Sequence, residues 1–481
     1  MVASGWLWIV RYYKSNQSDR KSWEVADMSH SNSATVDLLH GPVAHTLMRF
    51  SLPFMLSTLL QTLYSTTDTV IVGQYLGSAG LSAVSNGSQL MQLMYMICIG
   101  FSTAGQILIA QSQGAGEYEK TKKVIGSLFV LELILSALIG LICVVFSRQL
   151  LNLLYTPEEA FSQAMYYTMI CGVGMVFTGF YNMLSAVLRG MGDSRHPLLF
   201  VIIASICNVV LDILFITVFD WNVAGTAFAT VIGQAISVVF SFVFLRGHED
   251  VLHVSFRFKD MQPDKHTVKQ IASLGIPTAI QGGAIQFSFL FVSRMVNTLG
   301  LNVSAAFGVA QKLRNLPGIL TQGLQLGASS MIGQNWGAGE TERVSSTVKC
   351  SILLATGINL CFGLVFALAP NLCFRAFTQD EDVLVYAGIC IIAIVAELPG
   401  RCFMPGCNSL ISAQGFVEFG FIMSFVDAFA GRVFFCWLLG IALNMGALGF
   451  FLGYSAGTYL TAIPGLVYYA SGLWKRRKVL I

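Results

Sequence analysis

The stretch IAQSQGAGEYEK at residues 109–120 recurs as IGQNWGAGETER at residues 332–343. Each copy ends an apolar run with a Gly-Ala-Gly turn and then becomes charged. The same shift along the chain, from 109 to 332, also brings Leu76-Gly77 onto Leu299-Gly300. The sequence therefore consists of two related halves, and the second half is expected to repeat the fold of the first.

The composition of the 481 residues indicates that most of the chain lies in lipid. Hydrophobic residues make up 55% and charged residues only 11%, against about 25% charged in an ordinary soluble domain. This excludes a soluble enzyme, a disordered protein and a nucleic-acid-binding module, and the net charge of +3 is too small for a polyanionic partner. The eleven cysteines form no CxxC pair and lie near no histidine at metal-ligand spacing, so neither a disulfide framework nor a zinc site is predicted.

Twelve apolar segments are long enough to cross a bilayer as helices. They lie at 46–76, 82–111, 122–147, 161–188, 197–219, 223–245, 270–297, 303–332, 344–370, 383–412, 417–440 and 446–473. Because each repeat holds six helices, an even number, both copies enter the membrane from the same side. The predicted fold is an all-α integral membrane protein with two six-helix lobes related by a pseudo-two-fold axis.

Lysine and arginine gather in alternate loops and in the tail, which predicts that both termini and the central loop are cytoplasmic. The protein is expected in the cell (inner) membrane as a monomer surrounded by the lipid bilayer. Residues 1–27, before Met28, are either part of the leader or a start-site artefact. The predicted organisation is a disordered cytoplasmic leader at 1–41, an N lobe at 42–246, a linker at 247–269, a C lobe at 270–473 and a basic tail at 474–481.

Ionisable residues inside membrane segments are candidates for function, because each costs about 3 kcal/mol to insert. Asp68 and Asp212 are predicted at one depth, about 12–14 Å below the outer surface at 1.5 Å per residue. Asn208 lies one turn from Asp212, and Thr230 lies at a similar depth. Such a group could take up a proton or hold Na⁺ through several oxygens. The alternative is that a backbone carbonyl or a tyrosine satisfies each carboxyl group locally.

Other membrane charges favour a structural interpretation. Glu397 and Arg401 are spaced i, i+4 on one predicted helix and are expected to pair. Asp427 and Arg432 fit the same interpretation. Glu132 has no obvious local partner, so its role stays open.

Several motifs together resemble those of the multidrug and toxic compound extrusion (MATE) transporters. They are STTDTVIVGQ at 65–74, LRGMGDSRHP at 188–197, NVVLDILFI at 208–216 and the two glycine-rich repeats. The resemblance covers nearly the whole chain from about Leu39. It implies twelve helices in two lobes and cation-driven export of organic cations.

The resemblance also implies roles for particular residues. Asp68 matches the first-helix aspartate of the family, Asn208 and Asp212 match its NxxxD pair, and Thr230 matches the threonine that completes the N-lobe cation site. The remaining candidates are a hinge at Pro53 and cleft or substrate residues at Gln61, Tyr64, Asn182 and Gln281.

The chain departs from the NorM-like branch in its second half. That branch carries a glutamate eight residues after the helix-7 proline, where this chain has Ile285. We therefore expect coupling through the N lobe, with no metal ion other than Na⁺ at Asp68 and Asp212 and no cofactor.

The function predicted from these features is an H⁺- or Na⁺-coupled antiporter that exports small organic, mostly cationic, drugs by alternating access. The main alternative is a flippase of related fold for lipid-linked saccharides, which would need a strongly cationic cleft. An integral-membrane enzyme would need clustered histidine, cysteine or acidic motifs, which the sequence lacks. A channel fits the composition, but the duplicated lobes favour a transporter.

Overall fold

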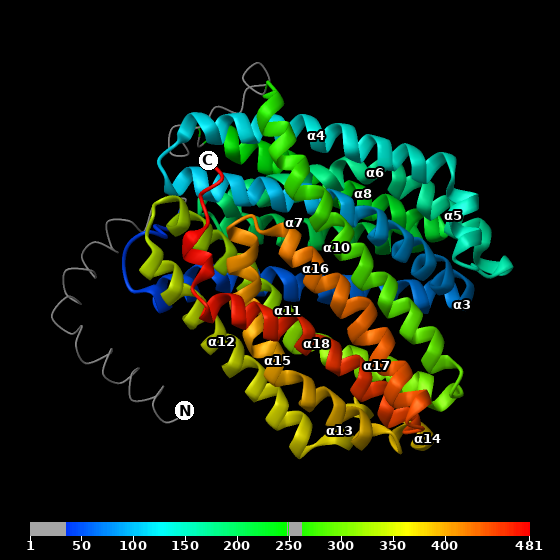
Figure 1. Ribbon diagram of the computed structural model, residues 1–481. Helices are drawn as coiled ribbons and strands as arrows, with labels where there is room; N and C mark the ends of the chain where they lie inside the picture. The colour runs from blue at the N-terminus through cyan, green and yellow to red at the C-terminus, as the bar shows by residue number, and fades with distance from the viewer. Residues whose placement is uncertain (1–34, 248, 250–261) are drawn as a thin grey trace.

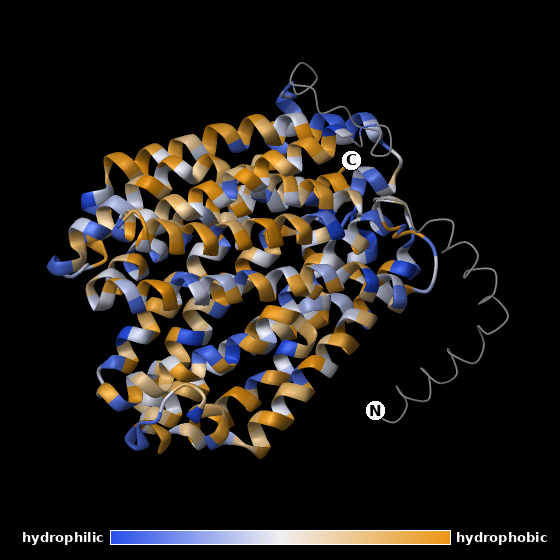
Figure 2. Ribbon diagram, turned by 180° about the vertical axis from the view of Figure 1, so that it is seen from behind, coloured by the Kyte–Doolittle hydropathy of each residue, from blue (hydrophilic) through white to orange (hydrophobic). Residues whose placement is uncertain are grey.

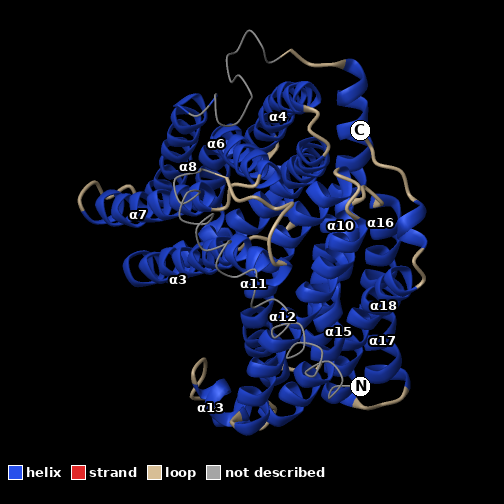
Figure 3. Ribbon diagram, turned by 90° about the vertical axis from the view of Figure 1, so that its left-hand side faces the viewer, coloured by secondary structure: helices blue, strands red, loops and turns tan. Residues whose placement is uncertain are grey.

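The computed structural model describes residues 35–247, residue 249 and residues 262–481 (Figure 1). The leader up to residue 34, including the alternative start at Met28, and most of the predicted linker lie outside the described residues. Within the described ranges the regular structure is helical throughout, as Figure 3 shows. The predicted all-α class is confirmed.

The first half of the chain supplies six long helical segments and one short helix. Its elements are α3 (Val43–Gly114), α4 (Tyr118–Val145), α5 (Ser147–Leu153), α6 (Glu158–Met191), α7 (Arg195–Thr217) and α8 (Asn222–Gly247). The backbone of α3 leaves helical geometry at Gly77, so this one element crosses the bundle twice. α5 was not predicted from the sequence.

The second half repeats this order with more interruptions. Its elements are α10 (Lys265–Asn297), α11 (Leu301–Gly337), α12 (Thr341–Leu368), α13 (Pro370–Arg375), α14 (Glu381–Leu384), α15 (Ala387–Ala413), α16 (Val417–Val426), η1 (Asp427–Val433), α17 (Phe434–Trp437), η2 (Leu438–Ala442), α18 (Gly446–Ala470) and η3 (Leu473–Arg476). The segments from α16 to η2 follow one another directly and form a single span of 26 residues.

The described part of the chain therefore contains the twelve predicted spans. Ten helices are long and apolar enough to cross a membrane, and α3 accounts for two crossings. The twelfth is α11, which misses this hydropathy limit because it carries polar side chains such as Gln311, Lys312 and Arg314. Several predicted ends were too short, since α11 continues to Gly337 rather than 332.

Two glycines confirm the repeat at the level of the backbone. Gly77 separates the two crossings of α3 with φ 66° and ψ −162°, and Gly300 precedes α11 with φ 104° and ψ 168°. This region of backbone conformation is open essentially to glycine alone. The aligned Leu-Gly pairs in the sequence thus mark the same turn in both halves.

One packed core is built mostly from the first half and another from the second half, and the outer helices present apolar side chains to the bilayer. One core gathers around Leu108, Leu128 and Leu184, and the other around Phe307, Ile391 and Phe450. Figures 1 and 2 show two bundles of helices with hydrophobic ribbons on the outside and hydrophilic residues gathered at the ends. On α4 an exposed apolar strip faces outward: Leu133, Ile134, Leu138, Leu141 and Val145.

The two halves cross closely at the end of the bundle where α3 begins and α18 ends, which we call the terminal end. A Cβ on Gly114 of α3 would collide with the Gln334 carbonyl of α11, and a Cβ on Gly337 of α11 would collide with the Gln111 carbonyl of α3. These four residues are equivalent pairs in the repeat. The glycine-rich motif therefore serves as a reciprocal helix crossing between the lobes.

Short segments at both ends of the chain also connect the two halves here. The Val36 N–H donates to the Gly192 carbonyl at 2.9 Å, and Arg343 donates to the Leu38, His40 and Gly41 carbonyls at 3.2, 2.7 and 2.6 Å. We call residues 35–41 the N-terminal strap. Near the other end of the chain, the Leu480 N–H donates to Gln111 Oε1 at 2.9 Å.

Candidate functional site

Asp68 and Asp212 meet inside the first lobe, although 144 positions separate them in the chain, from 68 to 212. Asp68 comes from the first crossing of α3 and Asp212 from α7, and their carboxyl groups lie close enough to interact directly. Asp212 has no exposed surface, and Asp68 is partly buried. The structure therefore brings the two aspartates together in the first lobe, and their role in coupling stays a prediction.

Most oxygens of these two carboxyl groups have no hydrogen-bond donor among the described residues. Neither oxygen of Asp212 nor Oδ1 of Asp68 receives a hydrogen bond from the described side chains and backbone. Two facing carboxylates in a buried site repel each other, and unpaired buried charge is costly. A proton shared between the oxygens, or a cation bound by them, removes both penalties.

Neutral oxygen groups lie beside the pair. Asn208, one turn before Asp212 on α7, donates through Nδ2 to Thr230 Oγ1 on α8 at 3.4 Å. Thr230 Oγ1 in turn donates to the Thr226 carbonyl at 3.0 Å, and Asn208 Oδ1 accepts no hydrogen bond within the described residues. The four residues predicted for a cation site thus come together, and their donor set of carboxylate, amide and hydroxyl oxygens suits H⁺ or a hard cation.

The described residues do not form a conventional multidentate metal centre. Among the described residues, no three His, Cys, Asp or Glu side chains gather at one point. Any Na⁺ held here would therefore depend on the two aspartates together with neutral oxygens.

The predicted cleft residues divide between the lobes. Tyr64 lies one turn before Asp68 and close enough to both carboxyl groups to interact electrostatically, and Gln61 Nε2 lies 3.5 Å from the Tyr181 hydroxyl. Asn182 donates to the Thr178 carbonyl of its own helix at 2.8 Å. Gln281 belongs to the other lobe, where its Nε2 donates to Ser424 Oγ at 2.7 Å.

Pro53 and Glu132 occupy very different surroundings. Pro53 lies inside α3, and Ser57 Oγ donates to its carbonyl at 2.9 Å, so the helix continues through the proposed hinge. Glu132 on α4 has no exposed surface, and its carboxyl group lies near the thiol of Cys98 on α3. This acid is separate from the aspartate pair.

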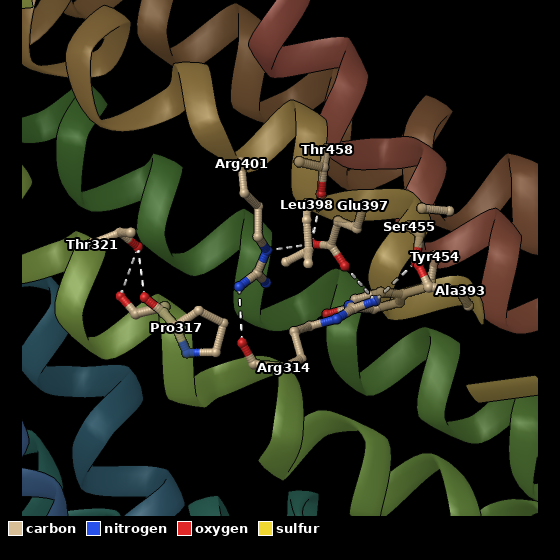
Figure 4. Close-up of polar contacts among 12 residues, drawn as sticks. Arg314, Pro317, Thr321, Ala393, Glu397, Leu398, Arg401, Tyr454, Ser455 and Thr458 are labelled. Carbon is tan, nitrogen blue, oxygen red and sulfur yellow. Dashed lines mark hydrogen bonds and ion pairs between the residues drawn. The ribbon is translucent and has the colours of Figure 1, made fainter. Parts of the chain in front are cut away.

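The expected Glu397–Arg401 pair forms, but it has a third member (Figure 4). Arg401 Nε lies 2.7 Å from Glu397 Oε1, and Arg314 Nη2 of α11 lies 2.7 Å from Glu397 Oε2. Thr458 Oγ1 also donates to Glu397 Oε1 at 2.9 Å. The sequence reasoning missed Arg314, which was visible as an arginine in the middle of a predicted span but had no indicated partner.

The expected Asp427–Arg432 pair also forms, at a spacing that an α-helix does not favour. Two contacts join the side chains, Nε to Oδ1 at 3.2 Å and Nη2 to Oδ2 at 3.0 Å. The π-helical turn η1 explains this, because it brings residues i and i+5 onto one side. The Tyr454 ring then lies between two guanidinium groups, 4.1 Å from that of Arg314 and 4.9 Å from that of Arg432.

Comparison with known proteins identifies the family. The model of the family described as MatE matches twice, over residues 53–214 and 277–438, which together cover more than half of the chain. The chain belongs to the MatE family. The two matched ranges repeat with nearly the same shift as the glycine-rich motif.

The relatives of this MatE chain align over three quarters or more of their own length. The probable multidrug resistance protein YpnP of Bacillus subtilis is 27% identical over 92% of this chain and 98% of its own. The multidrug export protein MepA of Staphylococcus aureus is 25% identical over 72% of this chain and 76% of its own. Family membership makes the chain a multi-pass membrane transporter.

Solved structures confirm the twelve-helix, two-lobe fold of the MatE chain. A structure of MATE in the straight conformation is 23% identical and covers 92% of this chain and 99% of that one, with a TM-score of 0.85. A transporter of the MOP superfamily from Pyrococcus furiosus, whose title describes a binding pocket of reverse polarity, is 24% identical and covers 91% of this chain and 98% of that one, with a TM-score of 0.85.

Proposed function

We propose that this MatE chain is an H⁺- or Na⁺-coupled antiporter that exports organic, mostly cationic, drugs. The observation that carries the proposal is the proximity of the Asp68 and Asp212 carboxyl groups, three of whose four oxygens receive no hydrogen bond from the described residues. Such a pair is stable when it holds a proton or a cation and unstable when it is empty and doubly charged. That difference is what a coupling site requires.

Exchange follows if the coupling cation and the drug stabilise different conformers. Cation binding at Asp68 and Asp212 neutralises the buried charge in one conformer, and a drug cation interacts best with the pair when it is charged. The two ligands therefore compete through one site, and the gradient of the first drives the second. Asn208 and Thr230 contribute oxygens to this site, and Pro53 in α3 is the proposed hinge.

The choice of drug-like cations rests on the named relatives and on the chemistry of the N lobe. YpnP and MepA are described as multidrug resistance and export proteins, and Tyr64 and Gln61 supply an aromatic ring and an amide near the carboxyl pair. An organic cation suits such a lining through charge and cation–π contacts. In this proposal the terminal end is cytoplasmic, since it carries the basic loops.

Transport by the purified protein in liposomes tests this function. Ethidium accumulation is measured under an imposed pH gradient, an imposed Na⁺ gradient, or neither. Uptake that depends on one gradient supports coupled antiport and identifies the ion. Equal uptake under all three conditions would contradict coupling, and transport of a lipid-linked saccharide in place of ethidium would favour the flippase.

A further inference from the structure

The second lobe carries a cluster of charges that the proposed coupling site does not use. It consists of Arg314, Glu397, Arg401, Asp427 and Arg432, all near the middle of their spans. The two aspartates of the first lobe give that lobe a concentration of negative charge, and the second lobe has the opposite balance.

The charges of this cluster do not cancel. Arg432 and Asp427 form a one-to-one pair with two contacts. In contrast, the single carboxylate of Glu397 pairs with two guanidinium groups, those of Arg314 and Arg401, each at 2.7 Å. Three arginines facing two acids leave one positive charge in excess, and an uncompensated charge at membrane depth favours an anionic partner.

The excess positive charge is accessible to a ligand at Arg401. Its side chain is 20% exposed, against 8% for Arg314 and 3% for Glu397. Nε binds Glu397, and Nη1 donates to the Arg314 carbonyl at 2.9 Å, in the turn of α11 that Pro317 interrupts (Figure 4). Nη2 binds no described residue and is not sealed from solvent. One face of the guanidinium is therefore free to accept a ligand.

This open face lies near the boundary between the lobes. Arg401 Nη1 would lie 3.3 Å from a Cβ on Gly318 of α11. The next residue, Ile319, accepts a hydrogen bond through its carbonyl from Thr58 Oγ1 of α3 at 3.0 Å. Thr58 precedes Asp68 by ten residues on the same helix, so the levels of the two charged sites differ by roughly 15 Å. That span is comparable to the length of a drug-sized aromatic molecule.

We propose that Arg401 binds the anionic group, a carboxylate in the first instance, of substrates that carry both a positive and a negative charge. The inference rests on the proposed function, because it adds a second recognition point to the export of organic cations. A guanidinium held by Glu397 and by a backbone carbonyl is fixed in orientation, which suits the planar, bidentate recognition of a carboxylate. The first lobe then selects the cationic group and the second lobe the anionic one.

A matched pair of dyes tests this assignment. Rhodamine B carries a cationic ring system and a free carboxylate, and its ethyl ester is the same cation with the carboxylate blocked. Arg401→Gln removes the excess charge and leaves Glu397 paired with Arg314 and Thr458, so the fold is expected to survive. Binding is measured in liposomes and by fluorescence anisotropy in detergent. This variant should bind rhodamine B about tenfold more weakly than the unmodified protein does. Its affinity for the ester should stay within about twofold of that of the unmodified protein.

Two further variants control the comparison. Arg401→Lys keeps a positive charge and should restore part of the affinity for rhodamine B. Arg375→Gln alters an exposed arginine at the opposite end of the bundle, paired with Glu381 at 2.9 Å, and should change neither dye.

The outcomes separate the inference from the proposed function. Both claims are supported if Asp68→Asn loses gradient-driven transport of both dyes while Arg401→Gln still weakens the binding of rhodamine B more than that of its ester. Absence of gradient dependence in the unmodified protein would overturn the proposed function alone, since anisotropy still compares the dyes. Equal weakening of the two dyes in Arg401→Gln, in a variant that elutes and melts normally, would overturn the role of Arg401. The role of Arg401 would also be overturned if added chloride alone weakened the binding of rhodamine B to the unmodified protein by the same amount.

Discussion

At the scale of single residues, the two lobes treat buried charge in opposite ways. Asp68 and Asp212 face each other without further donors, whereas Glu397 is surrounded by Arg314, Arg401 and Thr458. A satisfied carboxylate stabilises a packed lobe, and an unsatisfied pair is poised to take up a cation. The distinction comes from the partners of each acid, since burial alone is similar for Asp212 and Glu397.

Asp68→Asn keeps the shape of the side chain and removes its charge and its titratable proton. Gradient-driven drug efflux from everted vesicles should fall to about the level of vesicles without the protein, while expression stays near normal because a neutral residue costs less in lipid. Asp212→Asn should abolish efflux or weaken its cation dependence. Glu132→Gln is the matched control and should have a smaller effect, because its carboxyl group lies near Cys98 and not a second acid. Efflux at the unmodified rate in Asp68→Asn would shift the coupling site to the second lobe.

The sequence predicted contacts that can be counted along the chain, but it did not predict contacts that depend on how two helices pack against each other. Glu397–Arg401 follows from helical spacing, and Asp68–Asp212 from depth in the membrane, because both quantities can be counted along the chain. Arg314 could not be assigned to Glu397 in this way, since α11 and α15 could pack in many rotations about their axes. The partner of Gln281, a cleft candidate in the predicted second lobe, could not be assigned for the same reason; it donates to Ser424 of that lobe.

At the scale of elements, the crossing of α3 and α11 joins the lobes. Gly114 and Gly337 each leave room for a carbonyl of the other helix, so the two backbones approach as closely as helices can. α11 shows why hydropathy alone undercounts the spans, because several of its polar residues, such as Arg314, Ser330 and Asn335, are buried against other helices.

Gly337→Ala should loosen this crossing. The added methyl group meets backbone, which cannot move aside as a side chain can, and overpacking of this kind costs about 1–3 kcal/mol. The purified variant should unfold at a lower temperature than the unmodified protein in a thermal melt. Gly308→Ala is the control on the same helix, because a Cβ there has nothing within 4 Å. Identical melting of the two variants would show that the crossing tolerates separation.

At the scale of the whole molecule, segments near both ends of the chain bind across the terminal end. The N-terminal strap accepts from Arg343 in the second half and donates from Val36 to Gly192 in the first. Leu480 binds Gln111 in the first half. In an alternating-access cycle these bonds must break when the terminal end opens, so they stabilise the conformer that is closed there.

Arg343→Gln removes the charged donor that three strap carbonyls share. Hydrogen–deuterium exchange of residues 35–41 should become faster, because charge-assisted bonds contribute roughly 1.5–3 kcal/mol each. Lys349→Gln, an exposed change on the same helix, should leave the exchange unchanged. If the strap exchanges at the same rate in both variants, Arg343 does not hold it.

The reciprocal crossing also bears on the ancestry of the chain. Gln111 meets Gly337 while its equivalent Gln334 meets Gly114, which is the pattern of an isologous interface between two identical subunits. A six-helix ancestor carrying one QxxG motif could have dimerised with a copy of itself through this contact. Gene duplication would then have fused two copies that already fitted together, with no need to invert either of them in the membrane.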